Sequence, residues 1–236
     1  TDGVISAHNS GILVVGANRS GIDNAGMIEA GYGIFVDGDN AGQIVNAATG
    51  RIGAAGSGIH VALDNAGRID NAGLVRSDAT GIAVYGANSG SISSEGTEEV
   101  AAEIGAEGHG IQVGGANSGS IANGLYSTIV AGRGSTGILV ESDNTATGSL
   151  SNAGTIAGRD DSTSGIGIFG SNAGTIANSG TVQVGASGLY VNDGNAATGL
   201  IENSGSIVSG LGDGISVDGE NAGTIHNTDS GTIGAR

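Results

Sequence analysis

The sequence predicts an all-β fold: a right-handed parallel β-helix, or β-solenoid, of about nine coils of 22–29 residues with three short strands each. Three observations predict it. A G-[IL]-x-[VI] unit recurs along the chain, two columns of asparagine keep step with it, and the 236 residues include 49 glycines but no proline, cysteine or tryptophan. A repeat period of roughly 20–50 residues is typical of solenoids and related arrays.

The first predicted strand of each coil is the G-[IL]-x-[VI] unit itself. An aliphatic residue follows the glycine and a second one comes two residues later, as in Ile12 and Val14. Such period-two spacing of β-branched residues indicates a strand with one buried face. The unit glycines are Gly11, Gly33, Gly58, Gly81, Gly110, Gly137, Gly165, Gly188 and Gly214.

Two asparagine columns mark the corners of the predicted coils. Stacked asparagines can hydrogen-bond from coil to coil, which satisfies corner amides that would otherwise be buried without partners. The first column, seven residues after each unit glycine, is Asn18, Asn40, Asn65, Asn88, Asn117, Asn144, Asn172, Asn195 and Asn221. The second column follows a second short strand and is interrupted once, by Ser94; its members are Asn24, Asn46, Asn71, Asn123, Asn152, Asn178, Asn203 and Asn227.

A third aliphatic position, such as Ile52 or Val182, completes each coil. Strands this short cannot bury their apolar faces alone, so the coils must stack on one another, and a right-handed connection is the usual one between parallel strands. We therefore expect residues 1–236 to form a single solenoid domain, a fragment of a longer array. The segment Glu98–Glu107 is expected to loop off one corner, with room for one or two helical turns.

Composition excludes several classes of function. The formal net charge is −16, with 23 acidic and 7 basic residues, which argues against nucleic acids and anionic membrane surfaces as partners. The absence of cysteine excludes disulfides and thiolate metal sites. No apolar run approaches the length of a transmembrane helix.

The phrases N-A-G-R-I-D-N-A-G at residues 65–73 and N-A-G-T-I-A-N-S-G-T-V at residues 172–182 resemble the repeats of bacterial autotransporter passenger regions. The resemblance covers residues 11–233. It implies a β-helix displayed outside the outer membrane, with the parent chain anchored by a translocator barrel that is not in this sequence. It also implies adhesion, autoaggregation or a passive stalk, without a fixed set of catalytic residues.

The outward positions of the first strands are the expected binding face. They carry several of the few large side chains that the sequence can expose, and an apolar stripe of this kind can mark an interaction surface. The alternative is that a neighbouring segment covers them or that they are scattered exposed residues without a role. The candidate residues are Leu13, Phe35, Tyr85, Leu139, Phe169 and Tyr190.

Acidic corners offer a possible calcium site, because carboxylate oxygens are the ligands that Ca²⁺ prefers. The candidates are Asp37, Asp39, Asp218 and Glu220. Ordinary turn chemistry accounts equally for Asp, Asn and Gly at these corners, so no cofactor is expected otherwise.

An enzyme is the alternative function, because β-helices also host polysaccharide lyases and glycoside hydrolases with paired carboxylates. Asp160 and Asp161 are the best pair, but neighbouring strand residues point to opposite faces. The histidines lack metal-ligand spacing and are expected at the surface. Ice binding is disfavoured because the outward second-strand column is mixed. The expected function is therefore a non-catalytic extracellular passenger segment, an adhesive or a rigid spacer, whose partners are host or bacterial surfaces, glycan or protein, or another copy of itself.

Overall fold

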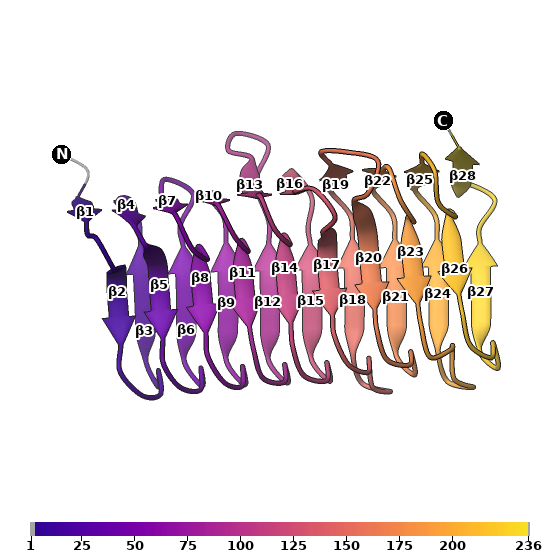
Figure 1. Cartoon of the computed structure of the whole chain (residues 1–236), viewed down its shortest axis with the longest axis horizontal. Coiled ribbons are helices and arrows are strands. Elements are labelled where there is room, and N and C mark those ends of the chain that lie inside the picture. Colours follow the sequence, from indigo (N-terminus) through magenta and orange to yellow (C-terminus); the bar gives the residue numbers. More distant parts are fainter. Residues whose placement is uncertain (1–2, 236) are drawn as a thin grey trace.

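The computed structural model describes residues 3–235, which wind into a rod of stacked coils with the two ends of the chain at opposite ends of the rod (Figure 1). Each strand pairs in parallel with the strand three places further along, so the three faces of the rod are three parallel sheets. The all-β solenoid of about nine coils with three strands per turn is thus confirmed. No helix that could cross a membrane occurs in this part of the chain.

The first strands of the coils form one sheet, which we call sheet B. Its strands are β2 (Ser10–Val14), β5 (Tyr32–Val36), β8 (Ile59–Val61), β11 (Ile82–Val84), β14 (Ile111–Val113), β17 (Thr136–Val140), β20 (Ser164–Ile168), β23 (Leu189–Val191) and β26 (Ile215–Val217).

The second strands form sheet D, which lies along the asparagine columns. Its strands are β3 (Gly21–Asn24), β6 (Gln43–Asn46), β9 (Arg68–Asn71), β12 (Ser91–Ser94), β15 (Ser120–Asn123), β18 (Ser149–Asn152), β21 (Thr175–Asn178), β24 (Leu200–Asn203) and β27 (Thr224–Asn227).

The third strands, with one further strand ahead of the first coil, form sheet A. Its strands are β1 (Val4–Ser6), β4 (Met27–Ala30), β7 (Arg51–Ala54), β10 (Leu74–Ser77), β13 (Ala102–Ala106), β16 (Ser127–Ala131), β19 (Thr155–Gly158), β22 (Thr181–Val184), β25 (Ser206–Ser209) and β28 (Thr232–Ala235). We number coils 1–9 by the unit glycine that opens each one, so coil 4 opens at Gly81 and coil 5 at Gly110.

The core is a set of aliphatic columns that run along the rod. Ile34 pairs in register with Ile59, and the column continues through Ile82 and Ile111, all with 0% exposure. Because the predicted aliphatic positions stack in register, each short strand buries its inner face against the coils before and after it. The columns thin out at the two ends of the rod, where Ile5 at one end and Ile225 and Ile233 at the other are exposed.

The unit glycine is required by close packing between sheets B and A. A Cβ atom at Gly33 would overlap the Cγ2 of Ile52, the third-strand residue of the same coil. The same overlap with a third-strand Ile or Val side chain recurs in other coils, for example Gly137 with Ile156. The glycine that defines the sequence repeat therefore makes room for a core side chain.

Both asparagine ladders are formed. In the first, each Nδ2 donates to the Oδ1 of the next coil, as in Asn88 to Asn117 at 2.8 Å and Asn117 to Asn144 at 2.9 Å. Asn117 and its inner neighbours have 0% exposure, so these bonds satisfy fully buried amides. The second ladder runs in the same way, for example from Asn152 to Asn178 at 2.7 Å.

The helical turns expected within Glu98–Glu107 are absent, and that expectation is wrong. Residues 102–106 are strand β13. Ile104 lies in register between Val75 and Ile129 and is fully buried. A place in the core column therefore outweighs the helical propensity of the alanines and glutamates around it. The insertion that was expected at this corner is present as the loop of residues 95–101.

Candidate binding face

The outer surface of sheet B carries most of the aromatic side chains. Residues two and four places after a unit glycine point away from the core, because side chains alternate across a strand. Phe35, His60 and Tyr190 occupy the first of these positions, and Tyr85 and Phe169 occupy the second. Coils in register bring such residues to about 4.8 Å from one another along the rod, which is a stacking distance.

Four rings form a continuous cluster over coils 2–4, which we call the aromatic cluster: Tyr32, Phe35, His60 and Tyr85. The rings of Phe35 and His60 are stacked, with centroids 4.4 Å apart and planes 11° apart. Tyr85 lies 4.9 Å from His60 on the next coil. Tyr32 packs edge-on against both Phe35 and His60, at 5.1 and 5.4 Å. Contacts of this kind add to the free energy gained by burial alone.

The cluster remains open to solvent at its edges. Tyr85 is 58% exposed and Tyr32 is 38% exposed. Beside them lies a shallow depression of about 520 Å³, floored and walled by Leu13, Tyr32 and Phe35 together with His8 and neighbouring backbone. Depressions lined by apolar and aromatic groups with a few polar atoms are the usual form of a ligand site.

His60 is buried within the cluster, contrary to the surface position expected for it. Only 9% of the residue is exposed, and its Nδ1 has no hydrogen-bond partner. Burial lowers the pKa of His60 below its usual value, although the charge of Asp37 acts in the opposite direction. The imidazole is therefore neutral near pH 7 and behaves as part of the aromatic stack.

A second aromatic pair lies further along the same sheet. The rings of Phe169 and Tyr190 are 5.9 Å apart. Tyr190 lies over Gly167, where a Cβ would overlap its ring, and its hydroxyl comes within 3.4 Å of Thr136 Oγ1. Desolvation raises the pKa of the Tyr190 phenol, so it stays protonated and available for this hydrogen bond.

Leu139 does not belong to the exposed face, and its predicted exposure is wrong. Only 1% of it is accessible. Gly167 is its register partner in the next coil, and the Tyr190 ring lies over that glycine and reaches the strand of Leu139. A long side chain from two coils away can thus bury a residue that strand alternation places outside.

The acidic corners make contacts within their own coil or with the next one. Asp39 Oδ1 accepts a hydrogen bond from the backbone N–H of Asp64 at 3.2 Å, and Asp218 accepts one from the hydroxyl of Ser216 at 3.1 Å. Asp37 acts electrostatically on His60. Nowhere in residues 3–235 do three or more histidine or acidic side chains gather as a metal site would require.

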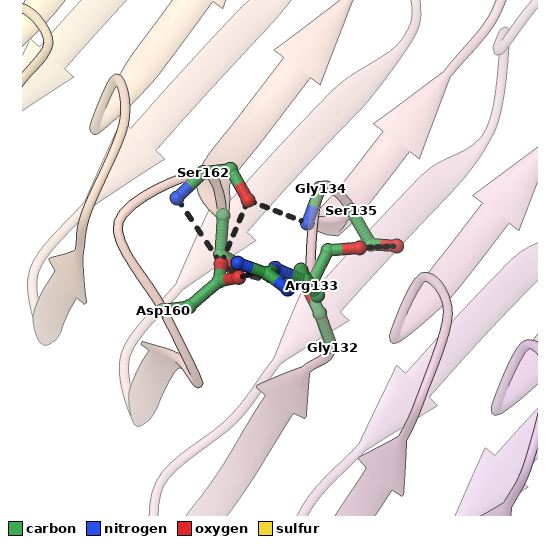
Figure 2. Close-up of polar contacts among 7 residues, drawn as sticks. Gly132, Arg133, Gly134, Ser135, Asp160 and Ser162 are labelled. Carbon is green, nitrogen blue, oxygen red and sulfur yellow. Dashed lines mark hydrogen bonds and ion pairs between the residues drawn. The ribbon is translucent and has the colours of Figure 1, made fainter.

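Asp160, the best candidate for an acid or base, is engaged in holding its own loop (Figure 2). Its Oδ1 accepts hydrogen bonds from the backbone N–H of Ser162 at 3.1 Å and from the Ser162 and Thr163 hydroxyls at 2.9 Å each. Its Oδ2 pairs with Arg133 Nε at 2.9 Å. Ser162 Oγ also accepts the N–H of Gly134, at 3.0 Å, which ties the loop to the preceding coil.

These contacts fix the charge of Asp160. Slight desolvation acts to raise its pKa, but the hydrogen bonds from Thr163 and Ser162 and the charge of Arg133 outweigh it and hold the pKa below the usual value. A general acid needs a carboxyl pKa raised toward the working pH, so the shift runs in the wrong direction for that role. Asp161 lies beside it on a groove of about 310 Å³.

Sequence reasoning placed Leu13, Phe35, Tyr85, Phe169 and Tyr190 on this face, and the structure brings them there in two groups. It missed Tyr32, and it counted His60 among the surface histidines instead of with this face. His60 occupies the same position after its unit glycine as Phe35, so the period itself was a signal for it. Tyr32 precedes its glycine, and no pattern in the repeat indicated that its ring would turn onto Phe35.

The chain matches no protein-family model, and neither a curated protein nor a solved structure matches it significantly.

Proposed function

We propose that the chain is a non-catalytic extracellular segment, similar in role to the autotransporter passengers it resembles, that adheres to a cell surface through the aromatic cluster on sheet B. The observation that carries the proposal is the stack of Tyr32, Phe35, His60 and Tyr85, which leaves apolar rings partly exposed beside a depression. Aromatic side chains with one open face are typical of binding hot spots.

The solenoid suits this role because it holds the rings on a rigid support. The strands beneath the cluster pair on both sides, and the core residues Ile34, Ile59 and Ile82 are fully buried. Sites on rigid elements lose little conformational entropy on binding. The partner in this proposal is a glycan or protein of a host or bacterial cell, and display at the surface of a bacterium would bring the two together.

The test is binding of the purified chain to a glycan array and to intact bacterial and host cells, with and without Ca²⁺. We expect saturable binding that falls at least about tenfold when Tyr32 and Tyr85 are both replaced by alanine. The matched control is Leu211→Ala, which removes an 81% exposed apolar side chain away from the cluster.

Two results would contradict the proposal. Saturable binding that the Tyr32→Ala/Tyr85→Ala variant retains would move the site elsewhere. The absence of saturable binding to any surface would favour the alternative, a rigid spacer. If the only partner found were a second copy of the chain, measured as concentration-dependent association in sedimentation, autoaggregation would replace adhesion to a foreign surface.

A further inference from the structure

The regular repeat is broken most strongly in coil 4, on the side of sheet A, and coil 5 carries a shorter insertion at the same corner. Glu103, Thr128 and Thr155 are register partners in successive coils. The corner between the second and third strands is short before Thr155, where it follows Asn152. The corresponding corners before Glu103 and Thr128 are longer. The extra residues are a projecting loop at residues 95–101, ahead of β13 (Figure 1), and the pair Leu125 and Tyr126.

These two insertions are tied to each other. The backbone N–H of Gly96 donates to the carbonyl of Leu125 at 3.1 Å, and that of Ala102 donates to the carbonyl of Tyr126 at 3.0 Å. The Tyr126 hydroxyl donates to Glu98 Oε1 at 3.1 Å. Within the loop, the backbone N–H of Thr97 donates to the carbonyl of Val100 at 2.7 Å. The loop and the Tyr126 corner therefore form one wall instead of two separate flexible tips.

Tyr126 is held in a strained backbone conformation. Its φ is 54°, and no other non-glycine residue in the described part of the chain has a positive φ. A bulky residue in the left-handed region costs free energy, and such strain persists where the surroundings impose it. Tyr126 is 50% exposed, and the two insertions also expose Leu125 and Val100, at 57% and 39%.

A groove of about 570 Å³ lies at the foot of this wall. Tyr126, Leu125 and Glu98 line one side, and the floor includes Thr128 and Thr155, followed by Thr181 in the next coil. The three threonines are in register, so they stand at intervals of about 4.8 Å along the rod. The groove thus combines an aromatic wall with a regular row of outward-facing hydroxyls.

The charge and hydrogen-bonding groups of the groove indicate which class of ligand fits it. Its lining contains Glu98 and Glu99 but no basic side chain, which disfavours phosphates and acidic polymers. The floor strands β16 and β19 pair on both sides, so an extended peptide finds no free edge to join. What remains is recognition by ring stacking and by hydrogen bonds to hydroxyl groups, which suits the apolar faces and hydroxyls of an uncharged sugar chain.

We propose that the Tyr126 groove binds a neutral polysaccharide that lies along the rod axis, with a sugar ring against Tyr126 and its hydroxyls on the threonine row. The site is separate from the aromatic cluster on sheet B and does not depend on the function proposed for that face.

The test uses the full chain and soluble neutral polysaccharides, namely dextran, mannan and a β-glucan, in affinity electrophoresis, with heparin as the anionic comparison. We expect retardation by at least one neutral polymer, and about tenfold weaker binding of it after Tyr126→Gly. Glycine relieves the positive φ, so this variant should fold at least as stably as the parent chain. Thr155→Val, which removes one hydroxyl at constant shape, should also weaken binding.

Leu63→Ala is the control, because it removes an exposed side chain that does not line the groove, and it should leave the polysaccharide affinity unchanged. Tyr85→Ala tests the aromatic cluster as the alternative site for the sugar. Binding to none of the neutral polymers, to heparin alone, or with equal strength by Tyr126→Gly would overturn the proposal. Loss of binding in Tyr85→Ala but not in Tyr126→Gly would assign the sugar to the aromatic cluster instead.

Discussion

The hydroxyl of Ser127 donates a 2.8 Å hydrogen bond to the hydroxyl oxygen of Ser94 in the preceding coil. Ser94 interrupts the second asparagine ladder, and Ser127 stands where the next coil has Gly154. A Cβ at Gly154 would overlap the backbone carbonyl oxygens of Ser127 and Gly124 and come within 2.9 Å of the Asn123 amide nitrogen, whereas Ser127 faces the shorter side chain of Ser94. The exchange has one cost: Asn123 Oδ1 is buried without a donor.

The pair predicts a strong coupling between the two positions. Ser94→Asn alone should destabilise the fold by about 1–3 kcal/mol, because the larger amide meets the Ser127 side chain. Ser94→Asn with Ser127→Gly should be more stable than the parent chain by about 1 kcal/mol, since Asn123 Oδ1 then gains a donor. Urea denaturation of both single variants and the double variant gives the coupling free energy. Additive effects of the two changes would contradict this account.

The first ladder allows a matched comparison of the same substitution inside and at the end of the rod. Asn117 is fully buried and bonded to Asn88 and Asn144, whereas Asn221 is exposed. Asn117→Ala should lower the free energy of unfolding by about 1–3 kcal/mol, because two buried amide groups lose a partner. Asn221→Ala should cost clearly less. Equal losses in the two variants, measured by chemical denaturation, would mean that the ladder does not act through buried hydrogen bonds.

The aromatic cluster predicts a pH-dependent stability. Burial lowers the pKa of His60 in the folded chain, so below about pH 6.5 the unfolded chain binds a proton that the folded chain does not. Stability should therefore fall as the pH drops from 7 toward about 5. His109, with its pKa also lowered by burial, adds to the same slope.

His60→Phe is the informative variant for this effect. It keeps a ring between Phe35 and Tyr85, removes the unpartnered Nδ1 and cannot be protonated. Thermal unfolding between about pH 5 and 7.5 should show a higher Tm and a shallower pH dependence than in the parent chain. An unchanged slope would assign the pH dependence to His109 or to other groups.

The repeat made the architecture predictable from sequence. Every coil has the same aliphatic position after its unit glycine and the same first-column asparagine. The burial of Ile111 and Asn117 could therefore be predicted from nine repeats of the same pattern. The failures lie where a side chain acts across coils. Leu139 is buried, and the Tyr190 ring reaches over Gly167 to the strand that carries Leu139. No pattern within one coil contains that information.

The candidate binding face was also predictable only in part. Strand alternation placed Phe35 and Tyr85 on the outer face, but it gave no account of ring-to-ring contacts or of Tyr126, whose position depends on the backbone of an insertion. The prediction of helical turns in the segment Glu98–Glu107 was wrong because it rested on local helical propensity. The strand there is determined by the pairing of Ile104 with the neighbouring coils.

The asparagine ladders have a direction, since each amide donates toward the following coil. Any coil can therefore be followed by any other, and the array can be lengthened or shortened by whole coils without reversing a hydrogen bond. Coils 4 and 5 are the exception, because Ser94 and Ser127 compensate for each other across their boundary. For the ladders, adding or removing a whole coil is therefore expected to cost least where that junction stays intact, so coils 4 and 5 act as one unit of the array.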